Sequence, residues 1–185
     1  FPAKPLGCYG DGGAIFTDND EYSETLKSIR IHGKSEDKYN NVRLGINGRL
    51  DTMQAAILLP KLNILEDEIK LRAKITEKYN TKLDNSFKGQ HILPKYNSAW
   101  AQYSILCNSS DHRETIISRL QEQDIPSAIY YQIPLHLQKV FEYLDFKKGD
   151  FPVSEDISSR VLSLPMHPYL KDEDIEKICK TINGI

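Results

Sequence analysis

Two hydrophobic periods in the last half of the chain distinguish a strand from a helix. Apolar side chains alternate with more polar ones between Ala101 and Cys107, which is typical of a half-buried strand. After Asp172, apolar residues follow the spacing i, i+3, i+4 and i+7, which predicts a closing helix with Asp172 as its cap. These helix positions are Ile175, Ile178, Cys179 and Ile182.

Further elements fill the region between this strand and this helix. The pattern predicts a helix that Asp111 caps, a strand, two helices and a last short strand. We expect an α+β sandwich with the helices on one face. The ranges of the last four elements are Ser127–Tyr131, Leu137–Leu144, Val153–Leu162 and Ser163–Met166.

The first 50 residues have a weaker pattern. Glycines between Gly7 and Gly13 predict a turn, and Ala14–Thr17 reads as a short apolar strand. Asp18, Asn19 or Asp20 caps a helix that reaches roughly Ile31. The polar stretch from 32 to 48 is an irregular loop, and loops of this length are usually functional or mobile.

A long helix begins at Asp51 and continues to Leu83. Gln54 lies three residues after Asp51, which is a capping-box pattern. Pro60 is expected to kink or split the helix, because proline lacks the backbone donor. Helices of this length commonly connect domains, so we place a domain boundary within residues 83–94. The predicted domains are residues 1–85 and 86–185.

Composition excludes several classes of protein. The net charge of -2 gives no basic surface for nucleic acid or for a membrane. No apolar run is long enough to span a bilayer. Cys8, Cys107 and Cys179 lack the spacing of a metal site or a disulfide framework, so we expect no metal. Cys107 and Cys179 read as buried apolar residues, and reduced thiols without a targeting segment favour the cytoplasm.

Lys4 is the first candidate for chemistry. A lone lysine is nearly always solvated. Lys4, however, follows an aromatic residue and a proline and precedes a glycine-rich turn. A lysine held on apolar structure loses hydration, which favours the neutral amine that can form a Schiff base. The glycines that follow favour a tight turn over a phosphate cradle.

Two further groups are ambiguous on residue chemistry alone. Asn47 and Arg49 precede a helix N-terminus, where an anion would be attracted. Either they bind a phosphate or carboxylate, or Asp51 caps the helix and Arg49 is solvated. Tyr131 and His136 lie on a loop between a strand and a helix. A histidine among apolar residues is more often structural, and stacking on a sugar or base is the alternative.

Four segments resemble the hallmarks of the DegT/DnrJ/EryC1/StrS family of sugar aminotransferases. The first contains Lys4 in the string Phe-Pro-Ala-Lys-Pro-Leu-Gly. The second contains Asn-Gly-Arg-Leu-Asp, and the third Pro-Leu-His-Leu-Gln. They occur in family order and cover essentially the whole chain. The segments are Phe1–Ala14, Arg43–Ala56, Tyr131–Gln138 and Ser163–His167.

The resemblance implies the α/β fold of a fold-type I aminotransferase that depends on pyridoxal 5'-phosphate. The chain would be its C-terminal portion: the end of the large cofactor-binding domain with a long connecting helix, and the small α+β domain. Lys4 matches the lysine that binds the cofactor and moves the substrate proton. Asn47 matches a residue that reaches the cofactor phosphate of the other subunit, which implies a homodimer with shared active sites. Arg49 is then placed to bind an acidic group of the substrate, with Tyr131 and His136 near the sugar.

Within the family, the resemblance is to enzymes that aminate a UDP-linked 3-keto-2-acetamido uronic acid, with glutamate as amino donor. Arg49 gives a chemical reason, since a carboxylate pairs well with a guanidinium. Such enzymes serve surface polysaccharide or glycan biosynthesis. The alternative substrates are 4-keto or 3-keto 6-deoxy nucleotide-sugars.

The family's upstream half has no counterpart in these 185 residues. With it go the residues that would bind the cofactor ring and most of its phosphate. We therefore expect the isolated chain to be inactive. A truncated module for dimerisation or binding, without chemistry, is the alternative from another class, and an intact mass near 21.2 kDa would favour it.

Overall fold

The structure is a computed structural model that describes residues 1–185. It divides into two compact units, Phe1–Leu65 and Glu66–Ile185, which meet inside the long helix α2 (Thr52–Lys82). The second half of α2 falls in the second unit because its apolar face is buried in that core. The predicted domain division after residue 85 stays a prediction for the whole protein. None of the helices combines the length and the apolar character that crossing a bilayer requires.

An antiparallel pair of strands forms the centre of the second unit. β1 (Tyr103–Leu106) pairs with β2 (Val161–Leu164), and Tyr103 lies opposite Leu164. Tyr103 and Ile105 are buried on one face, as the alternation predicted. On the other face, the hydroxyls of Ser104 and Ser163 are hydrogen-bonded at 2.8 Å.

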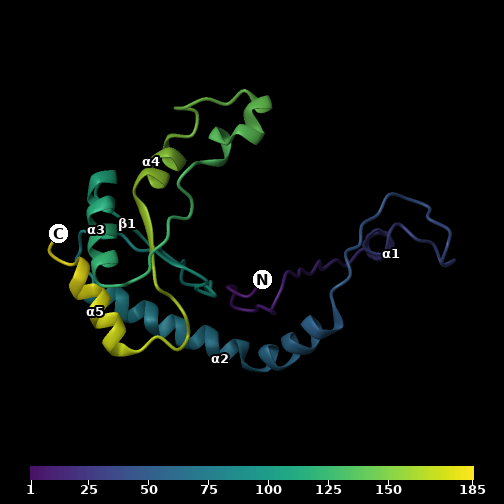
Figure 1. Ribbon diagram of the computed structural model, residues 1–185, viewed down its shortest axis with the longest axis horizontal. Helices are drawn as coiled ribbons and strands as arrows, with labels where there is room; N and C mark the ends of the chain where they lie inside the picture. The colour runs from purple at the N-terminus through teal and green to yellow at the C-terminus, as the bar shows by residue number, and fades with distance from the viewer. The chain divides into compact units, whose positions relative to one another are not determined.

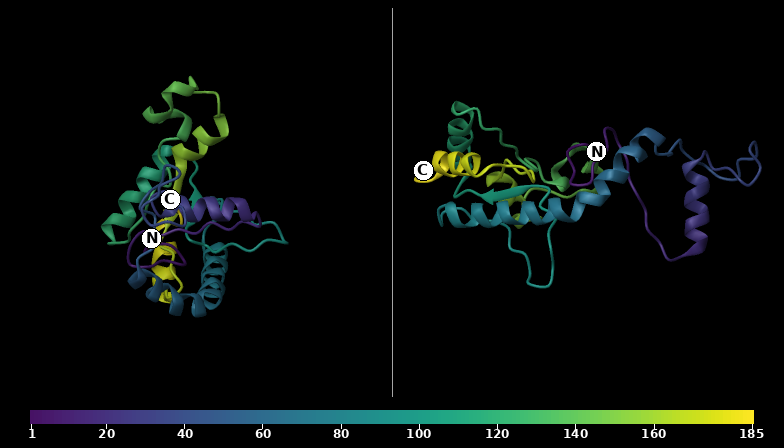
Figure 2. Two further views of the ribbon diagram at one scale, coloured as in Figure 1. Left: turned by 90° about the vertical axis from the view of Figure 1, so that its right-hand side faces the viewer. Right: turned by 90° about the horizontal axis from the view of Figure 1, so that it is seen from below.

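Three helices cover the apolar face of this sheet. They are the second half of α2, α3 (Ser110–Glu122) and α5 (Asp172–Ile182), which gather beside the strands in Figures 1 and 2. Tyr79 of α2 stacks on Tyr103 with ring centroids 4.7 Å apart. The four apolar positions predicted for α5 are all buried. The predicted α+β arrangement with helices on one face is therefore confirmed.

The cysteines behave as buried apolar side chains. Cys107 and Cys179 belong to the core of the second unit, as predicted, and burial raises the pKa of each thiol to about 11. Cys8 is buried in the first unit. Burial and the raised pKa both disfavour the thiolate, so neither Cys107 nor Cys179 is a candidate nucleophile.

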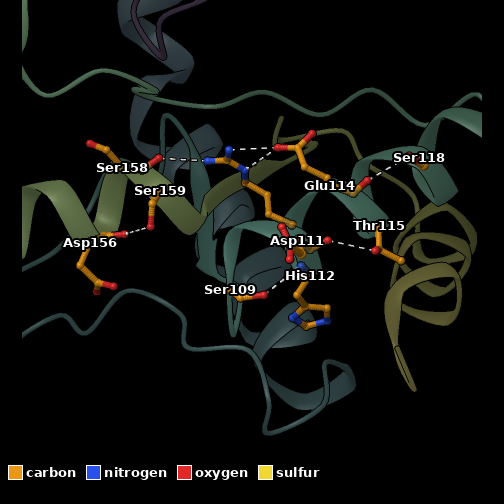
Figure 3. A network of polar contacts seen from close by, with 10 residues as sticks. Ser109, Asp111, His112, Glu114, Thr115, Ser118, Asp156, Ser158 and Ser159 are labelled. Carbon is orange, nitrogen blue, oxygen red and sulfur yellow. Dashed lines mark hydrogen bonds and ion pairs between the residues drawn. The ribbon is translucent and has the colours of Figure 1, made fainter.

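A buried arginine joins α3 to α4 (Pro152–Arg160). Arg113 of α3 is 5% exposed and donates to the carbonyl of Ser158 at 3.0 Å and to the carboxylate of Glu114. Figure 3 shows this network, with Ser158 and Ser159 on one helix and Glu114 and Thr115 on the other. The guanidinium thus satisfies a helix-end carbonyl that burial would otherwise leave without a donor.

Several predicted boundaries in the second unit are wrong by a few residues. Ser109, and not Asp111, caps α3, because its hydroxyl accepts from the backbone N–H of His112. Lys171 precedes α5, and no side chain caps that helix. Val161 and Leu162 belong to β2 and not to the preceding helix.

Two other elements are shorter or tighter than expected. The predicted strand around residues 127–131 is reduced to one bridge between Ala128 and Ser163. The predicted helix over 137–144 consists of two 3-10 helices, η1 (Leu135–Leu137) and η2 (Lys139–Leu144). Ala128 exchanges two backbone hydrogen bonds with Ser163 and Ile129 packs against the core, so the first segment follows β2 for only one residue pair. No residue of η1 or η2 belongs to the core.

The first unit contains α1 (Asp20–Arg30), which Asn19 caps, and a long loop. The loop folds back on itself through bridges from Ile31 to Asn47 and from Lys34 to Asn41. Residues 14–17 form no strand, which contradicts the prediction. Their backbone pairs with no other segment, and Phe16 is 93% exposed.

Two glycines allow the loop to close. A Cβ on Gly33, whose φ is +74°, would lie 1.8 Å from the carbonyl oxygen of Arg43. A Cβ on Gly45 would lie 2.0 Å from the backbone nitrogen of Gly33. The two arms of the loop can therefore cross only where neither residue has a side chain.

Of the two effects predicted for Pro60, the split is wrong and the kink stays a prediction. α2 continues through Pro60 as one helix of 31 residues, so the proline does not split it. The missing N–H still removes one hydrogen bond from the helix, to the carbonyl of Ala56.

Candidate functional site

Lys4 lies in a tight turn at the start of the first unit. Its backbone N–H donates to the carbonyl of Phe1 at 3.0 Å. The carbonyls of Phe1, Pro2 and Lys4 converge on Gly7, where a Cβ would lie 2.4, 2.9 and 3.1 Å from their oxygens. Gly7 is therefore required for this turn. The Lys4 residue is exposed, so the expected loss of hydration is not present in this structure.

The turn is attached to the start of α2. The side-chain oxygen of Gln54 accepts from the backbone N–H of Tyr9 at 2.8 Å. Gln54 therefore does not complete the predicted capping box with Asp51 but holds the segment after Lys4. A Cβ on Gly12 would lie 3.2 Å from a methyl carbon of Leu50, which shows how closely the two segments pack.

Asn47 and Arg49 form a direct pair. The Oδ1 atom of Asn47 accepts from Nε of Arg49 at 3.3 Å and from Nη2 at 3.2 Å. The loop backbone holds both residues, because Gly48 donates to the carbonyl of Arg30 at 2.9 Å. The position of this pair thus depends on the end of α1 as well as on α2.

The pair leaves hydrogen-bond donors free. Because a guanidinium has only donors, the Asn47 oxygen must face Arg49, and the Asn47 NH2 group faces away. Nη1 of Arg49 has no partner within the structure. Both residues are exposed and directly precede the N-terminus of α2, whose dipole favours anions. These groups fit pyridoxal phosphate in their chemistry. The amine of Lys4 can react with its aldehyde, and the amide of Asn47 and the guanidinium of Arg49 can donate hydrogen bonds to its phosphate.

Tyr131 and His136 lie in the second unit and have different environments. Tyr131 is 71% exposed and lines a cavity of about 790 Å³. The side chain of His136 is 7% exposed and does not line this cavity. Its Nε2 atom is 2.9 Å from a carboxylate oxygen of Glu155.

Glu155 is held as an anion. The backbone N–H of Gly149 donates to both its carboxylate oxygens, at 2.8 and 3.0 Å. These donors, first that of Gly149 and then His136, hold the pKa of Glu155 below its ordinary value. Sequence reasoning gave Glu155 no role and gave Gln54 only a capping role. Each has a weak signal: Glu155 lies in the first turn of a helix, and Gln54 occupies a capping position that a backbone donor can share.

The structure therefore joins some of the predicted residues and not others. Asn47 and Arg49 contact each other directly, and the turn that carries Lys4 contacts the same end of α2 through Gln54. These residues all belong to the first unit. Tyr131 and His136 belong to the second.

Known proteins resemble this chain over nearly its whole length. The model of the DegT/DnrJ/EryC1/StrS aminotransferase family matches residues 1–183. The UDP-2-acetamido-2-deoxy-3-oxo-D-glucuronate aminotransferase of Pseudomonas aeruginosa is 43% identical over 185 residues, which are 100% of this chain and 50% of that relative. The UDP-N-acetyl-3-dehydro-alpha-D-glucosamine 3-aminotransferase of Acidithiobacillus ferrooxidans is 36% identical. This match covers 98% of this chain and 48% of that relative.

Solved structures agree with these matches. A DegT DnrJ EryC1 StrS aminotransferase from Brucella abortus has a TM-score of 0.91 and 52% identity, over 98% of this chain and 48% of its own. S. venezuelae DesV, solved in complex with a ketimine intermediate, has a TM-score of 0.91 and 29% identity over the same shares. The chain spans about half the length of the curated relatives it matches. The predicted fold class is confirmed, and the chain belongs to the DegT/DnrJ/EryC1/StrS aminotransferase family.

Proposed function

We propose that the protein to which this chain belongs transfers an amino group to a keto nucleotide-sugar with the help of pyridoxal 5'-phosphate. The observation that carries the proposal is the placement of the Lys4 turn. Within one compact unit, this turn is anchored through Tyr9 and Gln54 to the helix start that Asn47 and Arg49 precede. An amine and two anion-binding side chains are thus held on adjoining segments.

Each side chain has a distinct task in this proposal. Lys4 Nζ is the atom that would hold the cofactor and the base that would move the proton of the substrate carbon. The free NH2 group of Asn47 would donate to the phosphate. The cofactor, when bound, supplies the electron sink of the reaction.

For the substrate we favour a UDP-linked 3-keto-2-acetamido uronic acid, with glutamate as donor, in surface polysaccharide or glycan biosynthesis. The P. aeruginosa relative carries that sugar in its name. The free Nη1 of Arg49 offers a donor for a uronate carboxylate. We further propose a cytoplasmic homodimer in which Asn47 serves the cofactor of the other subunit.

The cofactor role of Lys4 is testable in the protein that carries this sequence, with all the chain that its gene encodes. We expect Lys4→Ala to abolish both the visible absorbance of bound pyridoxal phosphate and the formation of 2-oxoglutarate from glutamate. Lys74→Ala, which replaces a lysine of α2 outside the first unit, is the matched control and should change neither. If Lys4→Ala keeps the absorbance band and the turnover, the proposed function is wrong.

The role of Arg49 is tested in the same assay with a panel of keto nucleotide-sugars. Arg49→Lys should lower kcat/KM for an acidic sugar by roughly tenfold, because one ammonium would have to serve both Asn47 and the carboxylate, whereas Arg49 binds Asn47 through Nε and Nη2 and leaves Nη1 free. A neutral keto sugar should be unaffected, and Arg119→Lys on the surface of α3 should leave both substrates unchanged. Equal losses on acidic and neutral sugars would refute the carboxylate contact.

A further inference from the structure

The cavity in the second unit has two walls from separate segments. One wall consists of residues within 130–138, which include Tyr131. The other consists of residues within 150–161, which run from the loop before α4 along that helix to the first residue of β2. In Figure 1 the green segment with η1 and η2 extends beyond α4, away from the strands. Since no residue of η1 or η2 is buried in the core, local contacts must hold the first wall.

The pair of His136 and Glu155 supplies that contact. The imidazole belongs to the first wall segment and the carboxylate to α4, and their side chains are 7% and 15% exposed. The His136 ring also packs on Phe151, with centroids 4.8 Å apart. A hydrogen bond to a carboxylate that is shielded from water is stronger than an exposed one, so removal of the imidazole takes away a strong contact between the two segments.

Glu155 extends this contact to the loop before α4. Its carboxylate accepts from the N–H of Gly149 and, at 3.4 Å, from that of Phe151. Within the first wall, Gln138 donates to the carbonyl of Ile133 at 3.3 Å, which keeps that segment compact. One carboxylate thus joins the first wall, the loop before α4 and α4 itself around the cavity.

His136 itself is poorly placed to contact a ligand. Its Nε2 is occupied by Glu155, and its ring lies outside the cavity lining, whereas Tyr131 is part of it. Resting on the proposed function, we infer that His136 is a positioning residue: through Glu155 it holds the wall that carries Tyr131, so that the cavity keeps its shape for part of the keto nucleotide-sugar.

The test compares two carboxylates that are neighbours on α4. Asp156 pairs with Arg160 at 2.6 Å, and neither of these two residues lines the cavity. In the complete protein, His136→Ala should raise KM for the keto sugar by roughly tenfold, as expected when a binding wall is misplaced. The rate of the half-reaction with glutamate should be unchanged. His136→Gln, which can still donate to Glu155, should restore most of the affinity, and Asp156→Asn should leave KM unchanged.

Hydrogen exchange gives a readout that does not depend on turnover. His136→Ala should speed exchange in residues 130–151 and leave α5 and the strands protected, which also shows that the variant folds. An unchanged KM in an active His136→Ala protein, or a failure of His136→Gln to restore it, overturns the inference and leaves the proposed function intact. Absence of turnover in the unmutated protein with every keto nucleotide-sugar refutes the proposed function itself.

Discussion

Gly7 shows how a residue without a side chain can determine where a reactive one lies. Three carbonyl oxygens converge on its α-carbon, and they belong to the turn that presents Lys4. Gly13, six positions further along the same segment, is a matched control: the same substitution is possible there, but an added Cβ would meet nothing within 4 Å. The two glycines look alike in the sequence and differ only in their surroundings.

We expect Gly7→Ala to weaken cofactor binding in the complete protein by at least about tenfold, because the Lys4 turn must shift to admit the methyl group. Gly13→Ala should bind the cofactor as the unmutated protein does. Titration with pyridoxal phosphate, followed by absorbance, measures both. Equal affinities for the two variants would mean that the turn is not needed to place Lys4.

Single-residue predictions from the sequence are right where the local pattern contains the information. The strand and helix periods point Cys107 and Cys179 to the core, and both are buried there. The environment of His136 cannot be derived in this way, because its partner Glu155 is distant in the sequence and is brought near by the loop before α4. The capping role predicted for Gln54 is wrong for the same reason, since Tyr9 competes for its oxygen.

At the scale of elements, the sequence predicts helices better than strands. α1, α2, α3 and α5 all begin within a few residues of their expected starts, because their apolar spacing repeats over several turns. A strand needs a partner that the sequence does not reveal. Residues 14–17 have strand composition and no partner in the structure, and residues 127–131 find only one bridge.

The start of α4 gives an expected pH dependence of stability. The pKa of Glu155 is lowered from 4.5 by the Gly149 N–H and by His136, so this group stabilises the fold above pH 4.5. That contribution is lost as the pH falls through the lowered pKa. The free energy of unfolding should therefore fall less steeply in Glu155→Gln than in the unmutated protein below pH 4.5.

Urea unfolding at neutral pH and at several values below pH 4.5 measures this difference. The pKa of Asp156 is also lowered, by Arg160. Asp156→Asn removes this second carboxylate and measures its own contribution to the pH dependence of stability. Parallel stability curves for Glu155→Gln and the unmutated protein would show that the contacts of Glu155 add nothing to folding.

At the scale of the whole molecule, the two units differ in how much core they possess. The second unit buries apolar residues from α2, α3, α5 and both strands. In the first unit the buried residues are Gly7, Cys8 and Gly33, and Leu44 is 96% exposed. Burial of apolar surface is the main source of folding free energy, so the second unit is the more stable of the two.

We therefore expect the 185-residue chain, prepared by itself, to give no turnover with keto nucleotide-sugars, since it spans about half of the relatives it matches. Hydrogen exchange of this chain should be slow in β1, β2 and α5 and fast in α1. Slow exchange in α1 would contradict the conclusion that the second unit is more stable than the first. Turnover by the chain alone would favour a self-sufficient enzyme.

The crossing of Gly33 and Gly45 also has a practical consequence for labelling. Beyond the crossing, the loop is closed again where the N–H of Ser35 donates to the carbonyl of Asn40 at 2.9 Å, and residues 37–39 are exposed. Added residues at this tip would extend into solvent without changing the register that sets Asn47 and Arg49. We therefore expect the 185-residue chain to accept an epitope or fluorophore tag between Asp37 and Lys38 without a change at Asn47 and Arg49.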